Sequence, residues 1–115
     1  MKLKNRIAII TGGGKGIGAE LSLKLASEGA KIIIAEMDVP NGEITAKKIR
    51  ENNGEAIVIK TNVADEDSVN NMANEAINVF GKIDIFINNA GIRHINNILD
   101  HTKQQWDDML SVNLT

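Results

Sequence analysis

Short apolar runs alternate with helical repeats along this chain, and the alternation constrains the fold more than any other feature. Four runs rich in isoleucine are predicted to be buried strands: 6–10, 31–35, 56–59 and 83–87. Between the runs, apolar residues recur every three or four positions, as they do on one face of a helix. Strands and helices that alternate through short links form a parallel sheet with helices on both faces, so we predict an α/β fold.

Local capping signals predict three helices between these strands, over 16–28, 40–53 and 66–80. A polar loop, 88–101, follows the last strand. A fourth helix is predicted after it, with these residues on one face: Trp106, Met109, Leu110 and Asn113. Because crossovers between parallel strands are right-handed, we predict one domain over 1–115 that is doubly wound, with strand order 3-2-1-4, and that stops before a fifth strand.

Composition excludes several kinds of chemistry. The 115 residues contain no cysteine, which excludes disulfides, thiol catalysis and cysteine metal sites. A formal net charge of −2 gives no sign of a nucleic-acid or membrane surface, so we expect a cytoplasmic protein that binds neither. His94 and His101 lack the spacing of a helical ligand pair, and we expect no metal site.

The stretch TGGGKGIG, Thr11 to Gly18, lies where the first strand gives way to the first helix. Glycine lets the backbone approach a ligand closely, and a helix N-terminus offers unpaired N–H groups to a phosphate. A phosphate loop of the Walker type is excluded, because Lys15 is followed by glycine rather than serine or threonine. The stretch therefore predicts a phosphate site of the pattern Thr-Gly-x-x-x-Gly-x-Gly, although a turn rich in glycine for packing alone is the alternative.

Glu36 directly follows the second apolar run, KIIIA. A dinucleotide-binding fold places an acidic residue at this strand end, where it accepts hydrogen bonds from the adenosine ribose hydroxyls. The alternative is a solvated carboxylate with no ligand. Because the glycine stretch, the strand end and the alternation agree, the sequence predicts a nucleotide cofactor.

Three segments carry a resemblance to a known family: TGGGKGIG, the stretch FINNAGI from Phe86 to Ile92, and SVNLT at 111–115. In this order and spacing, the chain resembles the short-chain dehydrogenase/reductase family over essentially its whole length. The resemblance implies a Rossmann-type fold and an oxidoreductase that transfers a hydride between a nicotinamide cofactor and an alcohol or ketone substrate. It also implies a homo-oligomer for the full-length protein.

The resemblance implies roles for individual residues. Asn62 stands where the family usually has aspartate and would meet the adenine amino group, whereas Asn113 matches a catalytic asparagine that positions a water. The residues expected to bind the cofactor are Gly12, Gly14, Lys15, Gly16, Ile17, Gly18, Glu36, Asn62, Val63, Asn89, Ala90 and Gly91.

The family's catalytic serine and its Tyr-x-x-x-Lys motif are absent, since the chain has no tyrosine. We therefore expect these residues to be the N-terminal, cofactor-binding half of such an enzyme, and to be inactive alone. A non-catalytic nucleotide-binding module is the main alternative. A methyltransferase is another, against which NNAG and SVNLT argue.

The choice between NAD and NADP depends on two residues. A carboxylate at Glu36 repels the 2′-phosphate of NADP, whereas Lys15 stands where NADP-dependent members of the family often carry a basic residue. Glu36 would meet the ribose directly, and Lys15 has a long flexible side chain that can turn to solvent or pair with Glu36. We therefore predict NAD as the cofactor, with NADP less favoured.

Overall fold

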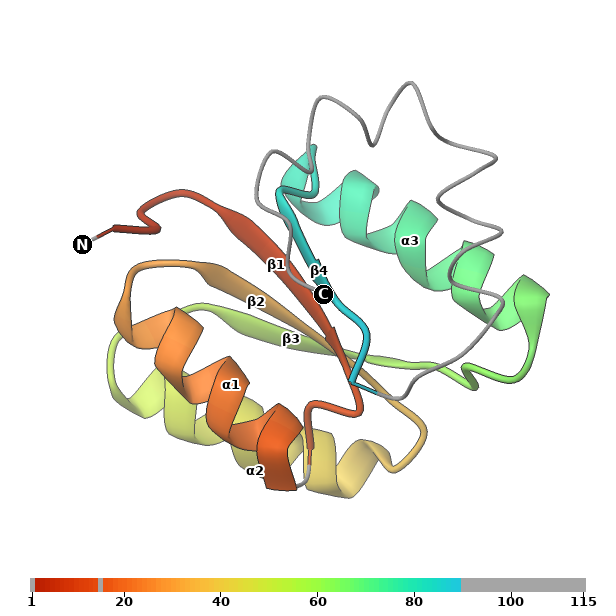
Figure 1. The fold of residues 1–115 in the computed structure, drawn as a ribbon, viewed down its shortest axis with the longest axis horizontal. Coiled ribbons are helices and arrows are strands. Elements are labelled where there is room, and N and C mark those ends of the chain that lie inside the picture. The colour runs from red at the N-terminus through yellow and green to blue at the C-terminus, as the bar shows by residue number, and fades with distance from the viewer. Residues whose placement is uncertain (1, 15, 90–115) are drawn as a thin grey trace.

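The computed structural model describes residues 2–14 and 16–89. Four strands and three helices alternate along this part of the chain (Figure 1). Their bounds are β1 Ile7–Thr11, α1 Gly16–Ser27, β2 Lys31–Glu36, α2 Val39–Glu51, β3 Ala56–Lys60, α3 Glu66–Phe80 and β4 Ile85–Ile87. The strands form one sheet in the order β3-β2-β1-β4, and every neighbouring pair is parallel. The predicted Rossmann-type α/β fold and its strand order are confirmed.

The central strands are buried on both faces, which is why their sequences read as unbroken apolar runs. All five residues of β1 are buried, and so are the four central residues of β2. Alternate side chains enter opposite layers of the core: Ile7 and Ile9 join one cluster, and Ala8 and Ile10 join the other.

The helices divide between the two faces of the sheet. Helix α3 covers one face, where Val69, Met72 and Ala76 pack against the first cluster. Helices α1 and α2 cover the opposite face, as Figure 1 shows; α2 contributes Ala46 and Ile49 to the second cluster, and Leu23 of α1 packs against it. The molecule therefore has three layers, with the sheet in the middle.

Helix ends follow the predicted signals to within two residues, since α1 ends at Ser27 rather than 28 and α2 spans Val39–Glu51 rather than 40–53. The side chain of Asp65 accepts hydrogen bonds from the backbone N–H groups of Asp67 and Ser68, and Gly81 ends α3 with a φ of 83°. Pro40 lies in the first turn of α2, whose N-cap is Asp38. These caps satisfy backbone groups that a helix end otherwise leaves unpaired.

All four strands differ slightly from the predicted ranges: β1, β2 and β3 extend one residue further, to Thr11, Glu36 and Lys60. The first strand begins at Ile7 rather than at residue 6, and the fourth spans only Ile85–Ile87 rather than 83–87. At β4 the difference coincides with Asp84, whose buried carboxylate accepts a hydrogen bond of 2.8 Å from the Ile7 N–H. A side chain thus takes this donor on the β4 side, where pairing starts at Ala8 opposite Ile85, whereas pairing with β2 already starts at Ile7 opposite Lys31.

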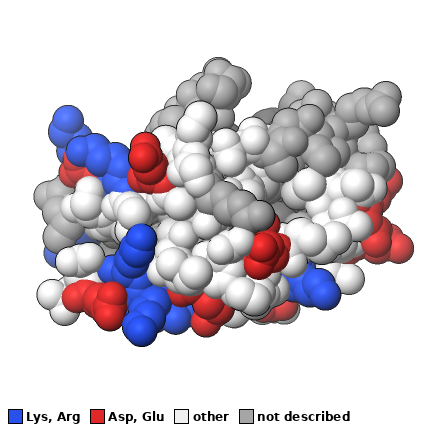
Figure 2. Space-filling model, turned by 90° about the horizontal axis from the view of Figure 1, so that it is seen from below, with Lys and Arg blue, Asp and Glu red and all other residues white. Residues whose placement is uncertain are grey.

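On the side of the molecule that carries α1 and α2, acidic and basic side chains are interspersed (Figure 2). Ion pairs join Lys24 to Glu28 and Arg50 to Glu43 there. Within the described residues, no helix is long and apolar enough to cross a membrane. The predicted fourth helix and most of the loop before it lie outside the described residues.

Candidate functional site

The carboxyl ends of β1 and β4 lie side by side at the point where the strand order reverses. The chain leaves β1 for α1, which covers one face, whereas α3 on the other face leads into β4. Ligands of open α/β sheets bind at such a switch point, outside the carboxyl ends of the strands. The predicted glycine stretch begins at this place, with Thr11 as the last residue of β1.

The glycine turn, Gly12 to Gly18, brings backbone groups together more closely than side chains would allow. Gly12 and Gly16 have φ values of 66° and 50°. A Cβ atom at Gly18 would lie 2.2 Å from the carbonyl oxygen of Gly12. The first turn of α1 therefore packs directly against the residue that leaves β1, and only glycine fits there.

Helix α1 begins at Gly16 and has no acidic residue in its first turn. Its N–H groups and the positive end of its dipole therefore face the turn without a nearby carboxylate of their own. Beside them, Ile17 keeps 70% of its surface exposed. This combination, a glycine cradle at the start of a helix, fits the pyrophosphate of a dinucleotide.

Asn89, which follows β4, reaches the glycine turn. Its side-chain Nδ2 donates to the Gly12 carbonyl oxygen at 3.5 Å, and a Cβ at Gly18 would lie 2.8 Å from the same nitrogen. Thr11 Oγ1 lies 3.4 Å from both the Ile87 carbonyl oxygen and Asn88 Oδ1. The structure thus places Asn89 against two of the predicted glycines, although more than 70 residues separate them in sequence.

Glu36 is the last residue of β2, and its half-buried carboxylate is bonded to the backbone. Oε1 accepts a hydrogen bond from the Gly14 N–H, and Oε2 accepts one from the Asp38 N–H, each at 3.1 Å. The sequence predicted a carboxylate at this strand end. It gave no sign that the same group would hold the glycine turn.

Asn62 and Val63 lie beyond the carboxyl end of β3, two strands from β1. The Asn62 N–H donates to Ser68 Oγ at 2.9 Å, and its side-chain Oδ1 accepts from the Ala64 N–H at 3.0 Å. These bonds form a turn that leads into α3. The Thr61 N–H donates to the Glu36 carbonyl oxygen at 3.1 Å, so the ends of β2 and β3 lie together.

The predicted site residues therefore fall into three groups. Gly12, Gly14, Gly18, Glu36 and Asn89 are brought together at the carboxyl edge, with Gly16 and Ile17 at the start of α1 beside them. Asn62 and Val63 lie at the same edge, next to the end of β2. Lys15, Ala90, Gly91 and Asn113 lie outside the described residues.

Sequence reasoning missed Gly42 and Ser68. A Cβ at Gly14 would lie 2.7 Å from the Gly42 backbone nitrogen, so the glycine turn also touches α2. A glycine inside a predicted helix was the available signal, because such a residue often marks a close approach. Ser68 carried no comparable signal, since a serine near a helix start is ordinary.

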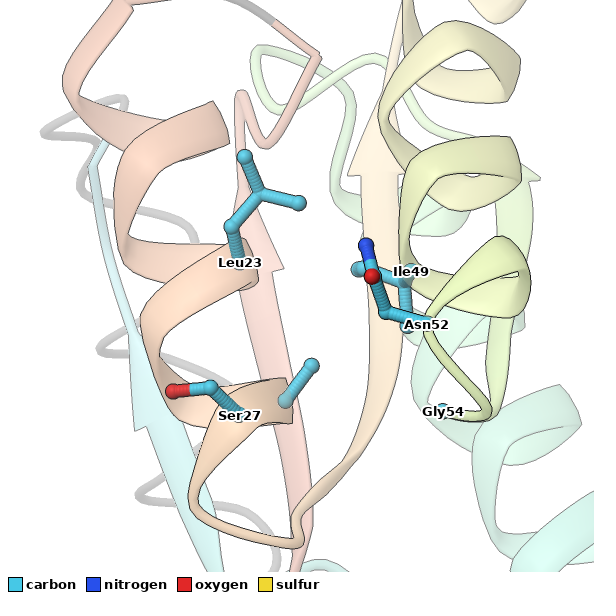
Figure 3. Close-up of a pocket in the computed structure, with 6 residues that line it drawn as sticks. Leu23, Ser27, Ile49, Asn52 and Gly54 are labelled. Carbon is cyan, nitrogen blue, oxygen red and sulfur yellow. The ribbon is translucent and has the colours of Figure 1, made fainter.

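A hollow of about 270 Å³ lies at the other end of α1 (Figure 3). Its lining includes Leu23 and Ser27 of α1, Ile49 of α2, and Asn52 and Gly54 after α2; the hydroxyl of Ser27 points away from Ile49 and Asn52. Since α1 starts at the glycine turn and ends at Ser27, the hollow is at the opposite edge of the sheet from the candidate site.

The chain matches known proteins over nearly all of its length. The sequence profile of the family described as short chain dehydrogenase matches residues 6–115. An uncharacterized oxidoreductase of Thermotoga maritima is 36% identical over 113 residues, which are 98% of this chain and 44% of that protein. The chain spans less than half the length of the curated relatives it matches.

Solved structures show the same fold. A short chain dehydrogenase/reductase from Burkholderia phymatum in complex with NAD has a TM-score of 0.71 and 30% identity, covering 75% of this chain and 31% of its own. A metagenomic short-chain oxidoreductase in complex with NADP has a TM-score of 0.76 and 29% identity, covering 80% and 42%. The parallel sheet, the glycine turn and the profile match over residues 6–115 agree. The chain therefore belongs to the short-chain dehydrogenase/reductase family of oxidoreductases.

Proposed function

We propose that this chain binds NAD as part of an oxidoreductase that transfers a hydride between the nicotinamide and an alcohol or ketone carbon. The observation that carries the proposal is the contact between the glycine turn and Glu36, at the carboxyl ends of the strands beside the switch point of the sheet. The family supports a nicotinamide dinucleotide, and its solved structures include complexes with NAD and with NADP. When bound, the cofactor supplies or accepts the hydride.

Different residues of the site would bind different parts of the cofactor. The N–H groups at the start of α1 would hold the pyrophosphate above Gly12, Gly16 and Gly18. Glu36 would accept hydrogen bonds from the adenosine ribose. The adenine would lie near Asn62 and Val63, and Asn89 with Ala90 and Gly91 would line the adenosine ribose side of the site. Lys15 and Ile17 would contact the cofactor from the turn.

The preference for NAD over NADP rests on Glu36. Its carboxylate is held by two backbone N–H groups, so it cannot swing away from a 2′-phosphate without losing both hydrogen bonds. A fixed negative charge at contact with a phosphate is costly. The free ribose hydroxyls of NAD can instead donate to its remaining lone pairs.

Catalysis needs a positioned acid or base, and the chain has no tyrosine to act as one. We propose that Asn113 positions a water in the proton relay, and that the 115 residues alone do not turn over a substrate. The substrate alcohol or ketone, the homo-oligomer and the cytoplasmic location are part of this proposal by family resemblance.

A non-catalytic nucleotide-binding module is the second candidate, because the glycine turn and Glu36 would serve binding alone as well as they would serve hydride transfer. Calorimetric titration of the protein expressed from its complete open reading frame separates the candidates from a methyltransferase. We expect NAD to bind and S-adenosylmethionine not to bind, and the reverse result would contradict the proposal. Ketone-dependent oxidation of NADH supports the oxidoreductase, whereas binding without turnover of a broad panel of ketones and alcohols favours the module.

A further inference from the structure

Glu36 joins three segments of the candidate site through one carboxylate. Its oxygens accept hydrogen bonds from the Gly14 N–H in the glycine turn and from the Asp38 N–H before α2. Asp38 is itself the N-cap of α2, because its Oδ1 accepts from the Asn41 N–H at 3.2 Å. A chain of hydrogen bonds therefore runs from the glycine turn, through the end of β2, to the start of α2.

Packing at Gly14 leaves little room for this chain to rearrange. A Cβ at Gly14 would lie 2.9 Å from Glu36 Oε1 and 2.7 Å from the Gly42 backbone nitrogen. Gly42 is equally constrained, since a Cβ there would lie 2.9 Å from Val58 Cγ1. The glycine turn, the carboxylate and α2 thus meet without an intervening side chain, and a change in one must move another.

We propose that Glu36 is a positioning residue for the glycine turn, in addition to its proposed contact with the ribose. This inference rests on the proposed function, because the turn is the proposed pyrophosphate site. By holding the Gly14 N–H, the carboxylate fixes the backbone just before α1, and so sets where the phosphate-binding N–H groups point. The Glu36 carboxylate should then raise the affinity even for nucleotides that have no ribose hydroxyl to donate to it.

A carboxylate that acted only on the ribose would behave in the opposite way. For a ligand without ribose hydroxyls, its one remaining influence would be repulsion of the negative phosphates. Replacing Glu36 by glutamine would then leave the affinity unchanged or raise it. If Glu36 positions the turn, the same substitution lowers the affinity, because an amide has a single acceptor oxygen for two N–H donors.

The test measures ADP and 2′,3′-dideoxy-ADP binding by calorimetry, on the protein expressed from its complete open reading frame. The variants are Glu36→Gln and the control Glu43→Gln, which makes the same chemical change at an exposed residue of α2 paired with Arg50. We expect Glu36→Gln to weaken 2′,3′-dideoxy-ADP about tenfold, the effect of losing one charge-assisted hydrogen bond. Glu43→Gln should leave both affinities unchanged. Unchanged or tighter binding of 2′,3′-dideoxy-ADP to Glu36→Gln would overturn the inference.

A second measurement needs no ligand and separates this inference from the proposed function. Hydrogen exchange of the Gly14 amide, followed by NMR in the free protein, should be slow in the unmodified chain and at least about tenfold faster in Glu36→Gln. Equal exchange rates in a folded variant would overturn the positioning role even if NAD binds. Failure of the unmodified protein to bind ADP or NAD, with the exchange difference intact, would overturn the proposed function alone.

Discussion

Two glycines of the same turn are needed for different reasons. Gly16 has a φ of 50°, a conformation that strains any other residue, yet a Cβ there would meet nothing within 4 Å. Gly18 has no such backbone requirement, but a Cβ there would lie 2.2 Å from the Gly12 carbonyl oxygen. Backbone atoms cannot move away from such a contact as the end of a flexible side chain can.

Alanine substitutions should separate these two requirements. We expect Gly16→Ala to lower the free energy of unfolding by about 1 kcal/mol, the strain of a left-handed alanine. Gly18→Ala should cost about 3 kcal/mol, because it forces the first turn of α1 away from β1. Urea denaturation of both variants measures the difference. Equal losses of stability would show that Gly18 is not in close contact with Gly12.

At the scale of elements, Asp84 joins β1 to the segment before β4. Its carboxylate accepts from the buried Ile7 N–H at 2.8 Å, and it also pairs with Arg6 at 3.4 Å and Lys82 at 3.2 Å. The side chains of Arg6 and Lys82 are about half exposed, at 47% and 48%. Exposed ion pairs contribute little, so the hydrogen bond to Ile7 is the larger effect.

Substitutions of Asp84 and Lys82 test whether the hydrogen bond to Ile7 contributes more to stability than the ion pair. We expect Asp84→Ala to lower the free energy of unfolding by about 2 kcal/mol, because the Ile7 N–H is left buried without an acceptor. Lys82→Gln removes one ion pair and should cost less than about 0.5 kcal/mol. Thermal and urea denaturation measure both. A larger loss from Lys82→Gln than from Asp84→Ala would mean that the ion pair dominates.

For the whole molecule, the sequence was enough to predict the layers and the strand order. Unbroken apolar runs such as β2 occur where both faces of a strand are buried, and right-handed crossovers in a Rossmann-type sheet predict the order that the structure has. The start of β4 was harder to predict, because the side chain of Asp84 is the partner of the Ile7 N–H on that side of β1. The spacing of apolar residues along the sequence gives no sign of this hydrogen bond.

The candidate site was predictable in its residue types and only partly in its contacts. The positions of Gly12, Gly18 and Glu36 follow from the strand and helix boundaries, because parallel strands end at one edge. The bond between Glu36 and Gly14 joins residues 22 positions apart, and depends on which way a flexible side chain turns. Local sequence patterns carry no signal for that choice.

For the whole protein, we propose a dinucleotide site whose fixed carboxylate, Glu36, selects NAD. Its most direct test is the pair of dissociation constants for NAD and NADP, measured on the protein expressed from its complete open reading frame and on Glu36→Ala. The ratio of the two constants cancels any shared effect of the glycine turn. We predict that the unmodified protein binds NAD at least about tenfold more tightly than NADP, and that Glu36→Ala removes this preference. Tighter binding of NADP by the unmodified protein would contradict the role given to Glu36.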